Sequence, residues 1–457
     1  MADKDFKTSL LVLFIFCITY VSAIVNNKVT RTVNLDGPNF IQSTSIEFTN
    51  DSKQDIDSYI LLVHKDQIDN LVFIEASLKD NVLNVTRDDT VSIPTDQFVP
   101  FKVNLEHLQA GGDMRIIVKE IYSKRLNPFP STMKLKDTPK IRVIDDAYYQ
   151  SIYNTKRMKS TFECDSANTV KATEIESGDV RGKTVRYGSF KDVKPLTTHV
   201  VFIQMAYNSP LPHFTKASRE VTLSHWASIS IEEEYRLTNR LPELSTGFGR
   251  VDYNPYNVKY ALTNLYCDLP LETTDLSYTD EIGNITTSNA YRDFDKVQFT
   301  IEPRFPIVGG WKTYWKQGYN LPRESYIKPT GNTDEYEFNI NFAHPFDDIV
   351  AEDFEFSIVL PEGATDTKLD IPFIMDSIDQ ETVFKYLDLQ GRQKVILRKR
   401  NILENVHDKN VRITYKLSPT HHYLKPALLV FYIFALVFVV NQILRCSSKN
   451  DSKVKRS

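Results

Sequence analysis

The sequence predicts a mainly β protein: two antiparallel β-sandwich-like lumenal domains followed by a single C-terminal transmembrane helix. Three observations support this fold class. The 457-residue chain has 27 Phe and 23 Tyr against 15 Gly, a balance that favours extended strands. Apolar and polar residues alternate with a period of two in many segments. Outside the two ends, no long stretch shows the 3.6-residue apolar period of an amphipathic helix.

The first element has the pattern of a secretory signal. Lys4 and Lys7 precede an apolar run over residues 10–21, and the string Val-Ser-Ala that ends at Ala23 supplies the small residues of a cleavage site. We expect residues 1–23 to be a signal peptide that is cleaved after Ala23. An uncleaved signal anchor is the alternative, which the short apolar run disfavours.

Two β domains are expected next, because about 400 residues exceed one ordinary sandwich. Domain 1 is placed at 24–219 and domain 2 at 220–423, since the polar, Pro-containing stretch 208–216 resembles a linker. Continuous apolar runs predict buried strands at 59–63, 114–118 and 200–203, and strict alternation predicts half-buried strands at 297–301, 336–342 and 411–417. No internal repeat is visible in the sequence.

The last element is the transmembrane helix, at 424–444. Residues 426–444 carry no charged side chain and would span about 28 Å as a helix, close to the hydrocarbon thickness of a bilayer. A buried core helix is the alternative. The tail at 445–457 carries a net charge of +4, so the positive-inside rule makes it cytosolic. The sequence thus predicts a single-pass type I membrane protein with its large part in the lumen, in contact with membrane lipid.

Composition and motifs argue against several functions. The net charge of −4 gives no electrostatic footprint for nucleic acid, so no nucleic-acid partner is expected. The string 178–184 resembles a phosphate loop but has three residues between its glycines where four are needed, and a hairpin turn explains it better. The sequence has no HExxH pair, GxSxG elbow or zinc-binding cysteine cluster. We therefore predict no catalytic, cofactor-binding or metal-binding residues, and no cofactor.

Candidate modification sites lie in the predicted lumenal part. Cys164 and Cys267 are the two cysteines there, and they form either one disulfide or two free thiols. Acceptor sequons for N-linked glycans begin at Asn50, Asn84 and Asn284.

Five strings carry a family resemblance. They lie, in order, at Ser224–Ile229, Tyr278–Ser288, Pro303–Thr313, Gly318–Pro322 and Leu360–Ala364. Together with the chain length and topology, they resemble the ribophorin I family, the type I subunit of the endoplasmic-reticulum oligosaccharyltransferase.

Two departures from the family pattern matter. Glu302 stands where the family often has Arg, which puts a charge-specific role there in doubt. The tail after Leu444 has 13 residues, as in fungal-type members, so the ribosome contact of longer relatives is not carried over.

The resemblance implies a non-catalytic role, structural or substrate-presenting. The complex transfers a preassembled oligosaccharide from dolichyl diphosphate to Asn of Asn-x-Ser/Thr. Implied partners are the catalytic and accessory subunits and nascent polypeptides, and the implied location is the endoplasmic-reticulum membrane. A type I cell-surface adhesion or receptor protein is the alternative, and a membrane-bound glycan-processing enzyme a further one. Trp226, Phe305 and Trp311, which lie in the shared strings, are expected to be core aromatics.

The tail also carries a candidate retrieval signal. Lys453 and Lys455 stand five and three positions from the C-terminus, a spacing that resembles the dilysine signal of endoplasmic-reticulum proteins. The alternative is that both lysines only satisfy the positive-inside bias.

Overall fold

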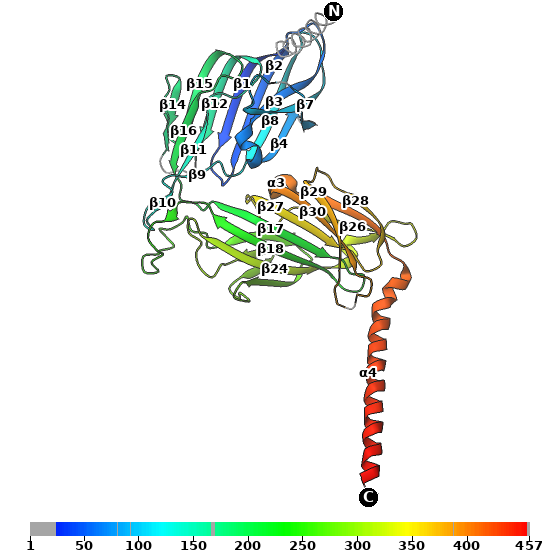
Figure 1. Ribbon diagram of the computed structural model, residues 1–457. Coiled ribbons are helices and arrows are strands. Elements are labelled where there is room, and N and C mark those ends of the chain that lie inside the picture. Colours follow the sequence, from blue (N-terminus) through cyan, green and yellow to red (C-terminus); the bar gives the residue numbers. More distant parts are fainter. Residues whose placement is uncertain (1–23, 80, 92, 166–169, 387, 455–457) are drawn as a thin grey trace, which may run out of the picture.

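The computed structural model describes residues 24–454 apart from 80, 92, 166–169 and 387. Figure 1 shows two β lobes in sequence, with one long helix leaving the second lobe on the side away from the first. The fold class predicted from the sequence is confirmed: the chain is mainly β and ends in one apolar helix. The predicted signal peptide and its cleavage after Ala23 lie outside the described residues.

The first lobe packs one large sheet against two small ones. The large sheet has eight strands in the order β14-β15-β12-β1-β2-β8-β4-β5. The small sheets have the orders β3-β7-β6 and β13-β16-β11-β9, and the 3-10 helix η1 (Lys65–Asn70) follows β3. Their strands are β1 (Ile24–Asn34), β2 (Phe40–Asn50), β3 (Ile56–His64), β4 (Leu71–Leu78), β5 (Asn81–Leu83), β6 (Val85–Arg87), β7 (Phe98–Leu108), β8 (Asp113–Tyr122), β9 (Asn127–Pro128), β11 (Lys140–Asp146), β12 (Asn154–Glu163), β13 (Val170–Ala172), β14 (Gly178–Arg181), β15 (Thr184–Val193) and β16 (Val200–Ala206).

The second lobe has the same plan. Its large sheet has the order β21-β24-β18-β17-β27-β30-β29, and its small sheets have the orders β20-β23-β22 and β25-β26-β31-β28. The helix α2 (Arg323–Tyr326) precedes β25, and α3 (Glu404–His407) follows β30. The strands are β17 (Pro212–Thr222), β18 (Ile229–Asn239), β20 (Leu265–Pro270), β21 (Thr274–Asp280), β22 (Asn289–Arg292), β23 (Lys296–Ile301), β24 (Lys312–Leu321), β25 (Ile327–Pro329), β26 (Glu335–Asn341), β27 (Ala351–Val359), β28 (Thr365–Asp370), β29 (Ser377–Val383), β30 (Arg392–Ile402) and β31 (Asn410–Lys416).

The two lobes are a structural repeat. Read from its other edge, the second large sheet runs β29-β30-β27-β17-β18-β24-β21 and matches β14-β15-β12-β1-β2-β8-β4 strand for strand. The small sheets match in the same way, β20-β23-β22 with β3-β7-β6 and β28-β31-β26-β25 with β13-β16-β11-β9. Most pairings are antiparallel, as predicted, but each large sheet contains one parallel pair at the equivalent place, β1 with β12 and β17 with β27. Neither the repeat nor its parallel pairs is visible in the amino-acid sequence.

Each lobe has its own hydrophobic core between its large and small sheets. In the first lobe, Val29 and Val118 of the large sheet pack with Val103 and Val143 of the small sheets. The alternating apolar residues predict this arrangement correctly: Val411, Ile413 and Tyr415 on β31 are all fully buried in the second core.

The lobes divide at the segment 207–211, between β16 and β17. The predicted division between residues 219 and 220 falls inside β17, which pairs along its length with β18 and β27. Pro212 begins this strand, a position where proline is tolerated, and so does not mark a linker.

Several contacts fasten the lobes together. The Asn39 side chain donates to the Asp348 carbonyl at 2.8 Å, and the Asn401 side chain donates to the Asp69 carbonyl at 2.8 Å. Strands β10 (Thr132–Met133) and β19 (Glu243–Leu244) form a short parallel pair between the lobes. A small apolar cluster joins them as well, made of Val72, Ile121, Val350 and Leu403.

The chain ends in α4 (Pro419–Val454). Its portion Pro419–Leu444 is long and apolar enough to cross a membrane, and no residue in the most apolar 18-residue stretch of it is buried.

Candidate functional site

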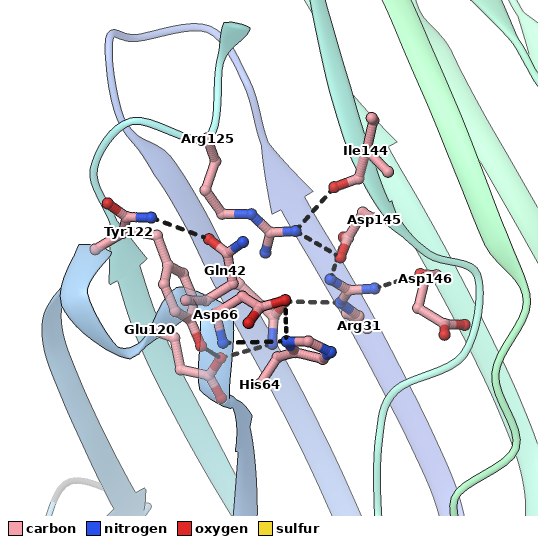
Figure 2. A network of polar contacts seen from close by, with 12 residues as sticks. Arg31, Gln42, His64, Asp66, Glu120, Tyr122, Arg125, Ile144, Asp145 and Asp146 are labelled. Atoms are coloured by element: carbon pink, nitrogen blue, oxygen red, sulfur yellow. Dashed lines mark hydrogen bonds and ion pairs between the residues drawn. The ribbon is translucent and has the colours of Figure 1, made fainter. Parts of the chain in front are cut away.

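A polar cavity of about 450 Å³ lies in the first lobe, where its three sheets meet. Strands β1, β2 and β8 line it from the large sheet, β3 and β7 from one small sheet, and β11 and β16 from the other. Figure 2 shows the polar network on its wall, with η1 and the end of β3 on one side and β11 on the other. His64 and Val200 are exposed at its rim.

Strand alternation places the charged groups inside the lobe. Arg31 points to the same inner face of β1 as Val29 and Val33, and all three residues are buried. Gln42 on β2 and Glu120 on β8 also take inward positions in apolar strands. A charged residue at a strand position where the alternation predicts a buried apolar one is the signal that could have located this site from the sequence.

Two guanidinium groups meet one carboxylate in the cavity. Arg31 Nε donates to Gln42 Oε1 at 2.8 Å, its Nη1 donates to the Asp146 carbonyl at 2.8 Å, and its Nη2 pairs with the Asp145 carboxylate. Arg125 Nη2 donates to Asp145 Oδ1 at 2.9 Å and to a main-chain carbonyl of β11 at 3.0 Å. Burial alone would raise the pKa of Asp145, but Arg31 and Arg125 outweigh it and hold this pKa below its ordinary value.

Glu120 has one satisfied and one unsatisfied oxygen. Its Oε2 accepts from Gln42 Nε2 at 2.9 Å and from the Tyr122 hydroxyl at 2.8 Å. Its Oε1, the Tyr149 hydroxyl and Gln150 Oε1 are buried without a hydrogen-bond partner among the described residues. Burial raises the pKa of Glu120 to about 7, although the Tyr122 hydrogen bond and the two arginines pull it down.

The second lobe has a matching network, in which both oxygens of the carboxylate have partners. Arg219 on β17 pairs with Glu233 on β18, Nε to Oε1 at 3.0 Å, and Glu233 Oε1 also accepts from the Tyr319 hydroxyl at 3.2 Å. Glu233 Oε2 accepts from Gln317 at 2.6 Å and from the Tyr235 hydroxyl at 2.9 Å. The carboxylate and amide have exchanged strands relative to Gln42 and Glu120, and both oxygens of Glu233 are used.

In both networks the arginine also donates a hydrogen bond to a main-chain carbonyl at the end of the matching strand. Arg31 Nη1 donates to the carbonyl of Asp146, the last residue of β11, and Arg219 Nη1 donates at 3.0 Å to the carbonyl of Asn341, the last residue of the matching strand β26. A cavity of about 350 Å³ lies beside Arg219 in the second lobe. The aspartate of one lobe is an asparagine in the other, so the first cavity carries more negative charge at this place.

The two predicted lumenal cysteines do not form a disulfide. Both are free thiols, Cys164 in the core of the first lobe and Cys267 in the core of the second. Burial raises the pKa of Cys164 to about 12, so it stays a neutral thiol. The disulfide considered from the sequence is wrong because the lobes form separate cores.

The sequons differ in exposure. Asn84 and Asn284 are exposed, as a glycan acceptor must be. Asn50 is fully buried, and its Nδ2 donates to three main-chain carbonyls, at 2.8, 3.2 and 3.2 Å. The folded lobe has no room for a glycan at Asn50, so that candidate is withdrawn. Lys455 lies outside the described residues, and Lys453 lies near the end of α4.

The shared strings gather partly at the base of α4. A groove of about 340 Å³ there is lined by Trp226 and Pro361 from two of the strings and by Pro426 and Leu429 of α4. Trp226 is 60% exposed, which contradicts the prediction that it is a core aromatic, and its ring stands edge-on to that of Tyr423, 6.3 Å between centroids. An indole and a phenol at the foot of an apolar helix are typical of the membrane interface.

The other two aromatic residues of the strings lie nearer the junction of the lobes. Phe305 is 45% exposed, so the core prediction is wrong for it too, while Trp311 is half-buried and packs against the cores of both lobes. In the described part of the chain, no three His, Cys, Asp or Glu side chains are placed to hold a metal ion.

Fold and sites together define a class: a pair of repeated β lobes carried on a single apolar helix, with a polar cavity in one lobe. Residues 24–444 match the family model described as Ribophorin I, and the chain therefore belongs to this family.

Relatives in two organisms support the assignment. The chain is 26% identical over 446 residues to "Dolichyl-diphosphooligosaccharide--protein glycosyltransferase subunit 1A" of Arabidopsis thaliana, covering 94% of this chain and 72% of that protein. It is 30% identical over 418 residues to the subunit 1 of Caenorhabditis elegans, covering 90% of this chain and 71% of that protein. Among solved structures, an M1 zinc metallopeptidase from Deinococcus radiodurans aligns over 45% of this chain and 42% of its own, at 9% identity and a TM-score of 0.26, too slight a likeness to define a shared fold.

Proposed function

We propose that this chain is a non-catalytic subunit of an oligosaccharyltransferase complex, which transfers a preassembled oligosaccharide from dolichyl diphosphate to Asn of Asn-x-Ser/Thr. One observation carries the proposal: the family match runs through both lobes and into α4, over residues 24–444. The relatives from Arabidopsis thaliana and Caenorhabditis elegans are named as subunit 1 of this transferase.

The chain is anchored in the endoplasmic-reticulum membrane by α4, with both lobes in the lumen. The basic tail after Leu444 supports this orientation through the positive-inside rule. Beyond its first turns, which contact the second lobe, the apolar stretch of α4 has no buried residue, so lipid and helices of other subunits are its partners. Exposed Trp226 and Tyr423 sit where interfacial aromatics would hold the second lobe at the bilayer surface.

The lobes serve as a scaffold or present substrate, and nascent polypeptides are their expected contacts. Asn84 and Asn284 are the expected glycan acceptors of the chain itself, because both are exposed.

Copurification tests the assignment. The tagged full chain, solubilised in a mild detergent, should recover the multi-spanning catalytic subunit, and the chain alone should transfer no glycan to an acceptor peptide. Recovery of a cell-surface complex without that subunit would favour the receptor alternative. Transfer activity in the isolated chain would overturn the non-catalytic assignment.

A second experiment tests the tail. The 13 residues after Leu444 are grafted onto a reporter that normally reaches the cell surface. Retention that is abolished by Lys453→Ser together with Lys455→Ser supports a retrieval signal. Unchanged surface delivery assigns residence to assembly into the complex.

A further inference from the structure

The cavity of the first lobe contains hydrogen-bonding groups that the fold itself leaves unused. Glu120 is 2% exposed and Tyr149 is 7% exposed, yet Glu120 Oε1 and the Tyr149 hydroxyl have no partner in the described part of the chain. Gln150 Oε1 is a third such group on the same wall. Buried polar atoms without a partner cost free energy, so three of them around one cavity indicate a ligand that supplies partners.

The charges of the cavity disfavour an ionic ligand. An anion would meet the carboxylates of Asp145 and Asp146, and the guanidinium groups of Arg31 and Arg125 are already bound to Asp145 and to main-chain carbonyls. A cation would meet those same two arginines. A neutral ligand remains. It must donate a hydrogen bond to Gln150 Oε1, and it can either donate to Glu120 Oε1 when that carboxyl is ionised or accept from it when it is protonated.

The walls also offer apolar faces. The rings of Phe98, Tyr122 and Tyr148 line the cavity beside the polar groups. Such a cavity, with aromatic rings and hydrogen-bond acceptors side by side, suits a neutral molecule that has hydroxyl groups around its edge and C–H groups on its faces. Pyranose sugars have this chemistry. A peptide strand would need an open sheet edge for its main chain, whereas this site is a concave cavity.

The second lobe provides an internal comparison. Its equivalent carboxylate, Glu233, uses both oxygens within the protein, on Arg219, Tyr319, Gln317 and Tyr235. The Glu233 carboxylate is therefore satisfied within the protein, whereas Glu120 Oε1 is not, although the second cavity also has one unpartnered oxygen among the described residues, Asn339 Oδ1. We propose that the cavity of the first lobe binds a neutral saccharide unit, with Glu120, Tyr149 and Gln150 accepting or exchanging hydrogen bonds with its hydroxyl groups. The proposal rests on the cavity and not on assembly into a transferase.

Ligand-observed NMR on the full chain tests the proposal. The chain is reconstituted in lipid nanodiscs free of glycolipid, because many mild detergents carry sugar headgroups. The probes are methyl α-mannopyranoside, methyl α-glucopyranoside and N-acetylglucosamine, each at millimolar concentration. Saturation transfer from the protein to at least one of them is the expected result. No transfer to any of the three overturns the proposal.

Two variants locate the binding. Tyr149→Phe removes only a hydroxyl that has no partner in the protein, so folding is preserved and the affinity should fall about 3- to 10-fold, the worth of one hydrogen bond. Its matched control is Tyr253→Phe, which removes another buried, unpartnered hydroxyl away from the cavity. Val200→Trp at the exposed rim should block entry, and Val180→Trp, exposed on the edge strand β14, should not. Unchanged sugar binding in Val200→Trp would place the sugar elsewhere and refute the assignment.

Two further outcomes separate the alternatives. Saturation transfer to the tripeptide acetyl-Asn-Ala-Thr-amide, with none to the sugars, would identify a peptide ligand and overturn the saccharide class. Sugar binding without copurification of the catalytic subunit would leave this inference standing and refute the proposed function, and the reverse result would do the opposite.

Discussion

Glu120→Gln should remove a pH dependence of stability that belongs to the first lobe. Burial raises the pKa of Glu120 from 4.5 to about 7, so the folded chain keeps this proton to a higher pH than the unfolded chain does. Between about pH 4.5 and pH 7, unfolding therefore releases a proton, and the free energy of unfolding falls as the pH rises. The stability contributed by protonated Glu120 is present at low pH and is lost as the pH passes through about 7.

The structure sets the size of this effect. A difference of about 2.5 pH units corresponds to about 3 kcal/mol, since each unit is worth 1.36 kcal/mol. The neutral amide of the variant keeps an acceptor for Gln42 and Tyr122 and has no proton to lose. We expect the variant to match the wild type at pH 5 and to be more stable by about 1–3 kcal/mol at pH 8.

Urea unfolding of the full chain at several pH values measures the difference, with hydrogen exchange read by mass spectrometry on the peptide that contains β8. This readout is needed because Trp226, Trp311 and Trp315, the three tryptophans, all lie beyond the strands of the first lobe. Glu106→Gln, an exposed change on β7, is the matched control. Parallel stability curves for wild type and Glu120→Gln from pH 5 to pH 8 would refute the reasoning.

Three other substitutions test separate features. Arg219→Met should destabilise the second lobe by about 3–5 kcal/mol in urea titrations, because it leaves the Glu233 carboxylate buried and unpaired; adding Glu233→Gln should recover part of the loss, and no recovery would count against the pairing. Gly309→Ala should cost about 1–3 kcal/mol in the same assay, since its methyl group would collide with the Pro242 carbonyl, and a neutral result would contradict that packing. Asn50→Ala should cost about 1–3 kcal/mol, and glycopeptide mapping of the wild type should find Asn50 unmodified; an occupied Asn50 would disprove its burial.

The sequence predicts many strands well because they are half-buried. The runs at 114–118 and 200–203, expected to be buried strands, also alternate, with every second residue facing outward. Phe338, Ile340 and Phe342 alternate with polar residues, and all three point into the second core. Alternation reveals that a strand has an inner face, but it does not identify the neighbouring strand. The parallel pair β1 and β12 joins segments more than a hundred residues apart, and nothing local in either strand specifies that partner.

The cavity escaped sequence analysis for a related reason. Arg31, Gln42 and Glu120 lie on three strands and form no motif along the chain. Each of them stands at an inward-facing position of a strand whose other inward positions are mostly apolar, as Arg219 and Glu233 do in the second lobe. Charged residues at inward-facing strand positions mark both networks in the sequence. Only the structure shows that Glu120 has an oxygen without a partner in the described part of the chain and that Glu233 does not.

The connection between the second lobe and α4 limits the movement of the whole chain. Only residues 417 and 418 separate β31 from α4, and an ion pair between Lys425 and Asp388 holds the start of the helix against the lobe. With α4 in the bilayer, as proposed above, such a short tether would give the lobes almost no freedom to rise from the bilayer or to sink toward it. Figure 1 places the first lobe beyond the second, at the end away from α4, so in that arrangement its cavity would stay at a nearly constant height above the lipid headgroups. A molecule attached to the membrane would then reach the cavity only if its own length spanned the second lobe, and the proposed site would select ligands by length as well as by chemistry.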